Sequence, residues 1–321
     1  MKIAYLINCH KNIKHVARLA HRLHSENNHI YIHVDKKVSE EIYKSLFSYT
    51  SDLEYCFISE MRIDGKLDDR SLVDIVMHLI SFAKNVAQQK SIHYSYYANM
   101  SGQDYPIKPM QYIHNKLKIS YPAVFMLCRD SSQAACVSRK FNRNKALIRY
   151  RNWTLKRKIT VVRKALQALG IIARKILKFF GKTAAQRIVK KGWNYYQGSA
   201  WWILSDIVID SIEKEYNSPN EFARIMIDES TTPEETYFQS LIMHNLLSEE
   251  HPLNNQEIKL LDFKTYVDFG NLSNRPIVHH PYILTINDYT SLLESDCWFA
   301  RKFDDTIDSS IIDKIDKYLL E

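Results

Sequence analysis

The stretch Ile3-Ala4-Tyr5-Leu6-Ile7-Asn8 is a short apolar run of the kind that forms a buried β-strand. A helical pattern follows over Asn12 to Leu23, and Ile30 to Val34 is a second buried run. The alternation continues with a helix over Ser39 to Phe47, a strand over Tyr55 to Ile58, a helix over Ser71 to Asn85 and a strand over Tyr94 to Met100. Such an order predicts an α/β fold, with a mostly parallel, Rossmann-like sheet flanked by helices.

The ends of the predicted strands indicate where a ligand binds. In parallel sheets, ligands sit beyond the carboxyl ends of the strands. The loops at His10, at Asp35 and at Ser101–Asp104 follow three of these strands, so we expect a nucleotide site there. Asp35 either receives a ribose hydroxyl or a base N–H, or it caps its own loop. His10 is a lone histidine, which is more often structural than catalytic.

Glycine usage excludes the common phosphate loops. The chain has only 7 Gly, and neither G-x-G-x-x-G nor G-x-x-x-x-G-K-[ST] occurs in it. The sequence therefore argues against a glycine-rich phosphate loop.

Charge is distributed very unevenly. Between Asp130 and Asp206 the chain has no acidic residue and carries 18 Lys and Arg, whereas the whole chain has 44 Lys and Arg against 36 Asp and Glu. The net charge of +8 therefore comes from one basic segment set into an otherwise acidic protein. Such a segment is expected to meet something anionic, such as phosphates, phospholipid headgroups or nucleic acid.

The basic segment also carries one apolar stripe, which predicts a helix over residues 155–180, about 39 Å long. Lys and Arg occupy its other face, a pattern that favours a helix lying in the interface of an anionic membrane leaflet. Packing on the protein's own acidic body is the alternative. Nucleic acid is not the expected partner, because aromatic residues are not interleaved. The stripe consists of Leu155, Ile159, Val162, Leu166, Leu169, Ala173, Ile176 and Phe180.

The remaining composition favours a cytoplasmic protein, peripheral on the inner face of the membrane. The five cysteines are widely spaced without a C-x-x-C pair, which fits a reduced protein without structural disulfides or a zinc cluster. The first apolar run is too short for a signal peptide. No apolar run of about 18 residues predicts a membrane span.

A pair of carboxylates stands at a predicted helix start. The helix is expected to run from Pro233 to about Leu247, with Thr231 or Thr232 as its N-cap. Glu234 and Glu235 follow the proline directly, where the helix dipole stabilises negative charge. The two glutamates either cap this helix or take part in catalysis.

Two further clusters have the composition of a sugar-nucleotide site. Trp201 and Trp202 follow small polar residues, as is common where sugars stack. Arg301 and Lys302 lie between aromatic residues, where they either clamp a diphosphate or form a solvated helix end. The pair His279-His280 has no further ligand at metal-binding spacing, and no D-x-D triplet follows a buried strand, so we expect no metal.

Six segments, taken together, resemble the core-2/I-branching glycosyltransferases, the group of branching β-1,6-N-acetylglucosaminyltransferases and peptide xylosyltransferases. They occur in the order of the family and cover roughly residues 3–130 and 195–305, and the motif Ser-Gly-Gln-Asp-Tyr-Pro is highly specific. The six segments are Ile3–His10, Ile32–Lys37, Ser101–Lys108, Gly198–Trp202, Pro233–Phe238 and Phe299–Asp304.

The resemblance implies a GT-A-type fold and an inverting transfer from a UDP-sugar without a metal. Glu235 matches the general base of the family, Lys302 the lysine that neutralises the diphosphate, and Asp35 the residue that reads the nucleoside. The donor-binding candidates are His10, Asp35, Arg62, Asp104, Arg301 and Lys302, and the acceptor-binding candidates are Glu234, Trp201 and Trp202.

Three features depart from the family pattern. The segment Lys66–Ser71 is charged where members usually carry Trp or Tyr shortly before a Ser. The second cation that binds the diphosphate, an arginine in the animal enzymes, falls near His279 or His280, with Arg275 close by. The basic segment has no counterpart that we recognise.

We therefore expect a single GT-A-type catalytic domain over 1–321. Residues 1–130 form its nucleotide-sugar-binding half, 131–195 a basic helical insert and 196–321 its acceptor and catalytic half. The expected reaction transfers N-acetylglucosamine from a UDP-sugar to an oligosaccharide or lipid-linked glycan, in bacterial surface polysaccharide or lipopolysaccharide synthesis. The alternatives are a xylosyl donor and a non-catalytic UDP-sugar-binding relative.

Overall fold

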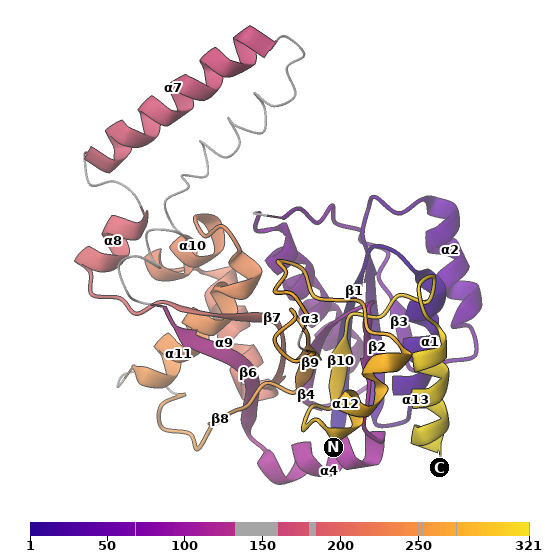
Figure 1. Ribbon diagram of the computed structural model, residues 1–321. Coiled ribbons are helices and arrows are strands. Elements are labelled where there is room, and N and C mark those ends of the chain that lie inside the picture. Colours follow the sequence, from indigo (N-terminus) through magenta and orange to yellow (C-terminus); the bar gives the residue numbers. More distant parts are fainter. Residues whose placement is uncertain are drawn as a thin grey trace.

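A computed structural model describes residues 1–67, 69–131, 160–179, 184–248, 251, 253–273 and 275–320. Strands and helices alternate in its first part (Figure 1), as the apolar runs predict. These elements are β1 (Lys2–Cys9), α1 (Ile13–Leu23), β2 (Asn28–Val34), α2 (Glu40–Tyr49), β3 (Cys56–Ile58), α3 (Ser71–Gln89), β4 (Tyr94–Ser101), β5 (Asp104–Pro106), α4 (Met110–Ser120) and β6 (Ala123–Asp130).

The second part begins with the basic helix and returns to the same sheet. Its elements are α7 (Thr160–Phe179), α8 (Ala184–Lys190), β7 (Tyr196–Ser205), α9 (Asp206–Asn217), α10 (Glu221–Asp228), the 3₁₀ turn η1 (Pro233–Glu235), α11 (Tyr237–Leu247), β8 (Lys259–Leu261), β9 (Thr265–Val267), the 3₁₀ turn η2 (Ile286–Asp288), α12 (Tyr289–Glu294), β10 (Phe299–Arg301) and α13 (Ser310–Leu320).

The main sheet has seven strands in the order β3-β2-β1-β4-β7-β6-β8. All its pairs are parallel except those of β7, which runs antiparallel to both β4 and β6. The prediction of a mostly parallel sheet flanked by helices is confirmed. Because β7 is reversed, its first residues lie at the edge where β1, β2 and β4 end, which brings a late segment of the chain to the expected ligand edge.

A second sheet of three strands, β5-β10-β9, covers part of the first. Strand β10 pairs antiparallel with β5 and parallel with β9, and Arg301 lies opposite Asp104. This small sheet fixes the segment that holds Lys302 beside the loop that follows β4.

Apolar side chains fill both faces of the main sheet, and this is what holds the layers together. One core lies among α3, α9, α10 and α11, and the other among α1, α2, α4, α12 and α13. Buried aromatic residues such as Tyr31, Trp202 and Phe238 belong to the first core.

Gly198 sits at an irregularity between β6 and β7. The pairing register shifts between Met126 and Cys128, and an added Cβ at Gly198 would lie 1.6 Å from the carbonyl oxygen of Leu127. No side chain fits there, so a glycine is required for β7 to approach β6.

We expect Gly198→Ala to destabilise the fold by about 1–3 kcal/mol, because the added methyl group must push the two strands apart. Thermal unfolding followed by circular dichroism measures this as a lower Tm. The neighbouring Ser199→Ala, which adds no atom, is the matched control. Equal Tm values for Gly198→Ala and wild type would contradict the close approach of the two strands.

Candidate functional site

The loops after β1, β2 and β4 are tied together at one edge of the sheet. The backbone N–H of Asp35 donates to the carbonyl of Cys9 at 2.8 Å, and that of Gly102 donates to the carbonyl of Asn8 at 2.9 Å. A Cβ at Gly102 would lie 2.6 Å from the Cβ of Cys9, so this position of the Ser-Gly-Gln-Asp-Tyr-Pro motif allows a close approach. His10 and Asp35 are therefore neighbours at the expected ligand edge.

The carboxylate of Asp35 organises its own loop. It accepts the backbone N–H of Lys37 at 2.8 Å and that of Gly65 at 3.0 Å, and the residue is 6% exposed. Arg62 donates to the carbonyl of Asp35 at 3.0 Å and stacks on Tyr43, with 4.5 Å from its guanidinium carbon to the ring centroid. Asp35 thus acts as a loop cap, and Arg62 braces that loop.

His33 fixes the segment that reaches Asp35 from the other side. Its Nε2 accepts the backbone N–H of Ile63 at 2.8 Å, and its Nδ1 lies 3.1 Å from Oδ1 of Asn8. An Nε2 that accepts carries no proton, so the imidazole is neutral and donates from Nδ1. Burial lowers the pKa of His33 to about 4, which agrees with this neutral form.

Arg301 is held between an acid and an aromatic ring. Its Nη1 lies 3.4 Å from Oδ1 of Asp104, and its guanidinium carbon is 4.1 Å from the ring centroid of Trp201. Burial lowers the pKa of Arg301 and raises that of Asp104, because loss of water costs each charge more than their attraction returns. Asp104 also accepts the backbone N–H of Ser101 at 2.8 Å. The pair is built into the wall of the site.

Lys302 lies in a cluster of positive groups at the ends of β1 and β10. Its carbonyl accepts the backbone N–H of Leu284 at 2.9 Å, which fixes its backbone. Burial, Lys11 and Arg301 all lower the pKa of Lys302. Burial lowers the pKa of His10 as well, and Lys11 and Lys302 add to that shift. Positive charge therefore gathers here, as a site for an anion requires.

Glu235 ends a short 3₁₀ turn and does not lie within an α-helix. The single helix predicted from Pro233 to Leu247 is wrong, because η1 is followed by a break at Thr236 before α11 begins. Thr232 precedes the turn without a side-chain capping bond, which also corrects the predicted N-cap. Glu235 Oε2 lies 3.5 Å from Nε2 of Gln197, at the start of β7.

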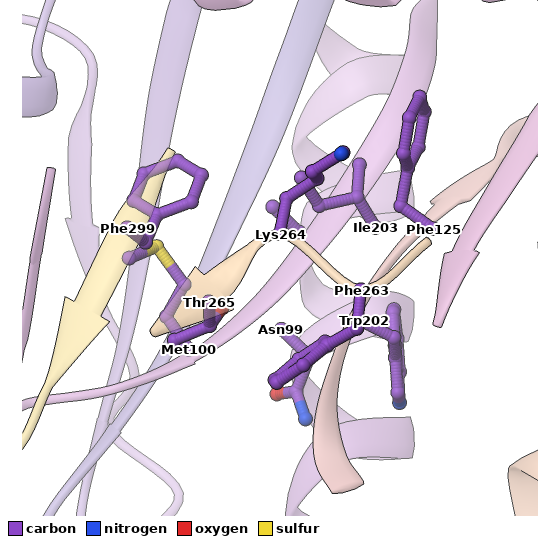
Figure 2. A pocket seen from close by; sticks show the side chains of 10 residues that line it. Asn99, Met100, Phe125, Trp202, Ile203, Phe263, Lys264, Thr265 and Phe299 are labelled. Carbon is purple, nitrogen blue, oxygen red and sulfur yellow. The ribbon is translucent and has the colours of Figure 1, made fainter. Parts of the chain in front are cut away.

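The two adjacent tryptophans have different surroundings. Trp202 is 2% exposed, and its ring packs against Phe238 at 5.2 Å between centroids, whereas Trp201 is half-buried beside Arg301. Figure 2 shows Trp202 and Asn99 in a pocket below the segment Phe263–Thr265. Trp202 thus belongs to the core, and of the pair only Trp201 lies beside the candidate diphosphate site.

Arg275 is paired with two acidic residues on and after the loop that follows β9. Its Nη2 donates to Asp268 at 2.7 Å and to Asp288 at 2.9 Å, and its guanidinium carbon stacks 4.3 Å from the ring centroid of Tyr282. These contacts hold the loop after β9 in shape. His279 and His280 are exposed on the same loop.

Helix α7 stands away from the sheet and its covering helices (Figure 1). In the predicted stripe, Val162, Leu169 and Ile176 are 44%, 57% and 50% exposed, and Ile171 and Ile172 are exposed too. This placement disagrees with packing of the helix on the protein's own body. The stripe residues Leu155, Ile159 and Phe180 lie outside the described residues.

Two further features are absent from the part of the chain that the structure describes. No helix there is long and apolar enough to cross a membrane. No group of three or more His, Cys, Asp or Glu there could hold a metal ion.

A mostly parallel α/β sheet with a charged edge of this kind has the architecture of a GT-A-type glycosyltransferase. A family model described as Branch: Core-2/I-Branching enzyme matches residues 3–293, nearly the whole chain, and the chain belongs to this family. The family implies a glycosyltransferase with a nucleotide-sugar donor and a glycan acceptor. Among curated proteins, none matches this chain. The family match ends before Arg301 and Lys302. The position of these two residues beside the loop after β4 is shown by the pairing of β10 with β5 in the small sheet.

Proposed function

We propose that this protein is an inverting glycosyltransferase that moves a sugar from a UDP-sugar to a hydroxyl group of a glycan. The start of β7 is the observation that carries the proposal. There Gln197 contacts Glu235 and Trp201 contacts Arg301, next to Lys302. These two β7 residues are about 13 Å apart at 3.3 Å per residue. One strand end thus contacts both a carboxylate and a positive group.

In the proposed reaction, Glu235 accepts the proton of the acceptor hydroxyl, which requires about 3 Å between their oxygens. The acceptor oxygen forms a bond to the anomeric carbon while the bond to the diphosphate oxygen breaks on the opposite face. UDP leaves with the bonding electrons, and the charge of Lys302 stabilises it. The configuration at the anomeric carbon is inverted.

Within this proposal the donor sugar is N-acetylglucosamine, with xylose as the alternative. The acceptor is an oligosaccharide or lipid-linked glycan of a bacterial surface polysaccharide or lipopolysaccharide. No metal is needed, because the positive cluster around Lys302 takes the role that a divalent cation has in other transferases. In this proposal Asp35 contacts the nucleoside end of the donor in addition to capping its own loop, and His10 lies beside it.

A panel of UDP-sugars tested in excess EDTA examines this proposal directly. We expect turnover with one donor and no loss on chelation. Turnover that disappears with EDTA and returns with Mg²⁺ or Mn²⁺ would overturn the metal-free mechanism. Binding of UDP without turnover of any donor would favour a non-catalytic relative.

We also propose that α7 attaches the protein to the anionic inner face of a membrane. Exposed apolar residues run along this helix, and Lys164 and Lys175 are exposed on it as well. No acidic residue opposes these charges between Asp130 and Asp206. Apolar contact with acyl chains and attraction to anionic headgroups would act together.

We expect the double change Lys164→Glu and Lys175→Glu to weaken binding to vesicles rich in anionic lipid by at least about 30-fold, since each lost basic residue removes about 1 kcal/mol there and each new carboxylate adds repulsion. Vesicle sedimentation measures the effect. Lys44→Glu with Lys118→Glu, on α2 and α4, is the matched control. Transfer to a water-soluble acceptor should remain. Equal vesicle binding by the two double variants would overturn membrane attachment through α7.

A further inference from the structure

The diphosphate of a UDP-sugar carries two negative charges, and Lys302 supplies one positive charge. Arg275, the arginine that the sequence offers as the second, binds Asp268 and Asp288. Arg301 is 9% exposed and pairs with Asp104. Another cation at the same edge would complete the site.

Lys11 has the right position and support. Its Nζ lies 2.7 Å from Oδ2 of Asp304, two residues after Lys302, and its side chain is 38% exposed. Asp304 is 5% exposed and also accepts from the side chain of Asn12 at 2.8 Å and from the hydroxyl of Thr306 at 2.6 Å. A carboxylate fixed by several donors thus holds the ammonium group of Lys11 in place while leaving part of it open to solvent.

The loops that carry the two lysines are joined. The backbone N–H of Phe303 donates to the carbonyl of Gln103 at 2.9 Å, and Gln103 Nε2 donates back to the carbonyl of Phe303 at 3.3 Å. Gly102, the neighbour of Gln103, donates to Asn8 on β1 at 2.9 Å. Lys11 and Lys302 are therefore held at the same edge by the backbone.

The electrostatics of the edge agree with this geometry. Burial lowers the pKa of Lys302 the most, and the charge of Lys11 is the next largest cause. The same two causes, in the same order, lower the pKa of His10. Asp304 raises the pKa of Lys302 and so offsets part of this repulsion, and an anion bound near the cations would relieve the rest. A diphosphate carries the charge that would relieve it.

We propose that Lys11 is a second diphosphate-binding residue, positioned by Asp304 to act together with Lys302. The proposal rests on the proposed function, because it names a contact to the donor of that reaction. Lys11 directly binds a phosphate oxygen of the nucleoside diphosphate, and Asp304 is its positioning residue.

Calorimetric binding of UDP and of uridine separates phosphate contacts from nucleoside contacts. We expect Lys11→Met to weaken UDP binding by about 10- to 100-fold, the usual effect of losing a charge-assisted hydrogen bond. Uridine binding should stay the same, and Lys11→Arg should restore most of the UDP affinity. The matched control is Lys14→Met, which removes an exposed lysine three residues away.

Each outcome decides a different point. Unchanged UDP affinity in Lys11→Met would overturn the proposal. Equal losses for UDP and uridine, or a large fall in Tm, with no recovery in Lys11→Arg, would make Lys11 a structural residue and overturn it too. If wild type binds neither UDP nor uridine, the proposed function itself fails, which is distinct from failure of the Lys11 contact.

Discussion

Replacing Glu235 with glutamine is expected to lower kcat by about 10²- to 10⁴-fold, the usual contribution of a positioned general base. The amide keeps the size of the side chain and its contact with Gln197, but it cannot accept the proton of the acceptor hydroxyl. Donor affinity should change little, since in the proposed reaction the carboxylate acts on the acceptor. Initial rates at saturating donor, together with the Kd for UDP, measure both quantities.

The neighbouring Glu234→Gln is the matched control for this variant. We propose that Glu234 binds the acceptor, so its loss should raise the acceptor KM more than it lowers kcat. A kcat of Glu235→Gln within a few-fold of wild type would remove Glu235 from the role of base. The same loss in both variants would point to a disturbed turn and not to proton transfer.

Replacing Lys302 with methionine is expected to lower kcat by about 10²- to 10³-fold, as for other groups that stabilise charge developing in the transition state. In the proposed reaction the leaving UDP gains negative charge as its bond to the sugar breaks, and Lys302 is half-buried, so solvent screens its charge less than at the surface. Binding of UDP should weaken as well, because the product carries the same charge.

Single-turnover rates for Lys302→Met and for Lys302→Arg test this expectation. Arginine keeps the charge and should retain part of the activity. Lys36→Met, on the exposed loop after β2, is the matched control for a lost lysine at the same edge. Full activity in Lys302→Met would mean that another group neutralises the diphosphate.

The sheet could be predicted from the sequence because its strands are continuous apolar runs. Ile3–Asn8 lies within β1, and Ile30–Val34 lies within β2, since buried parallel strands leave little freedom in residue type. The helix boundary at Glu235 could not be predicted. There the hydroxyl of Thr236 bonds to Ser230 at 2.9 Å and to the carbonyl of Thr232 at 3.0 Å, and such side-chain bonds compete with a helix.

The surroundings of several side chains could not be predicted, because they depend on contacts between segments that are far apart in the sequence. Adjacent residues of a strand point to opposite faces of the sheet, so Trp201 and Trp202 cannot both lie on the face of the candidate site. The sequence alone does not show which of the two tryptophans lies there. The pairing of Arg301 with Asp104 joins residues nearly 200 positions apart, and no local pattern signals it. The sequence offers one indication of a role for Lys11, which is its position next to His10. The roles of all these residues in the reaction stay predictions.

The neutral imidazole of His33 links the pH dependence of stability to the loop around Asp35. Burial lowers the pKa of His33 to about 4, whereas the unfolded chain titrates at about 6.5. Between these pH values His33 binds a proton in the unfolded chain but not in the folded chain. The free energy of unfolding therefore decreases as the pH drops through this range. Protonation also removes the acceptor for Ile63, which supports the loop around Asp35. Activity that is lost as the pH falls toward 4, where the folded imidazole takes up its proton, would then report a loosened loop around Asp35.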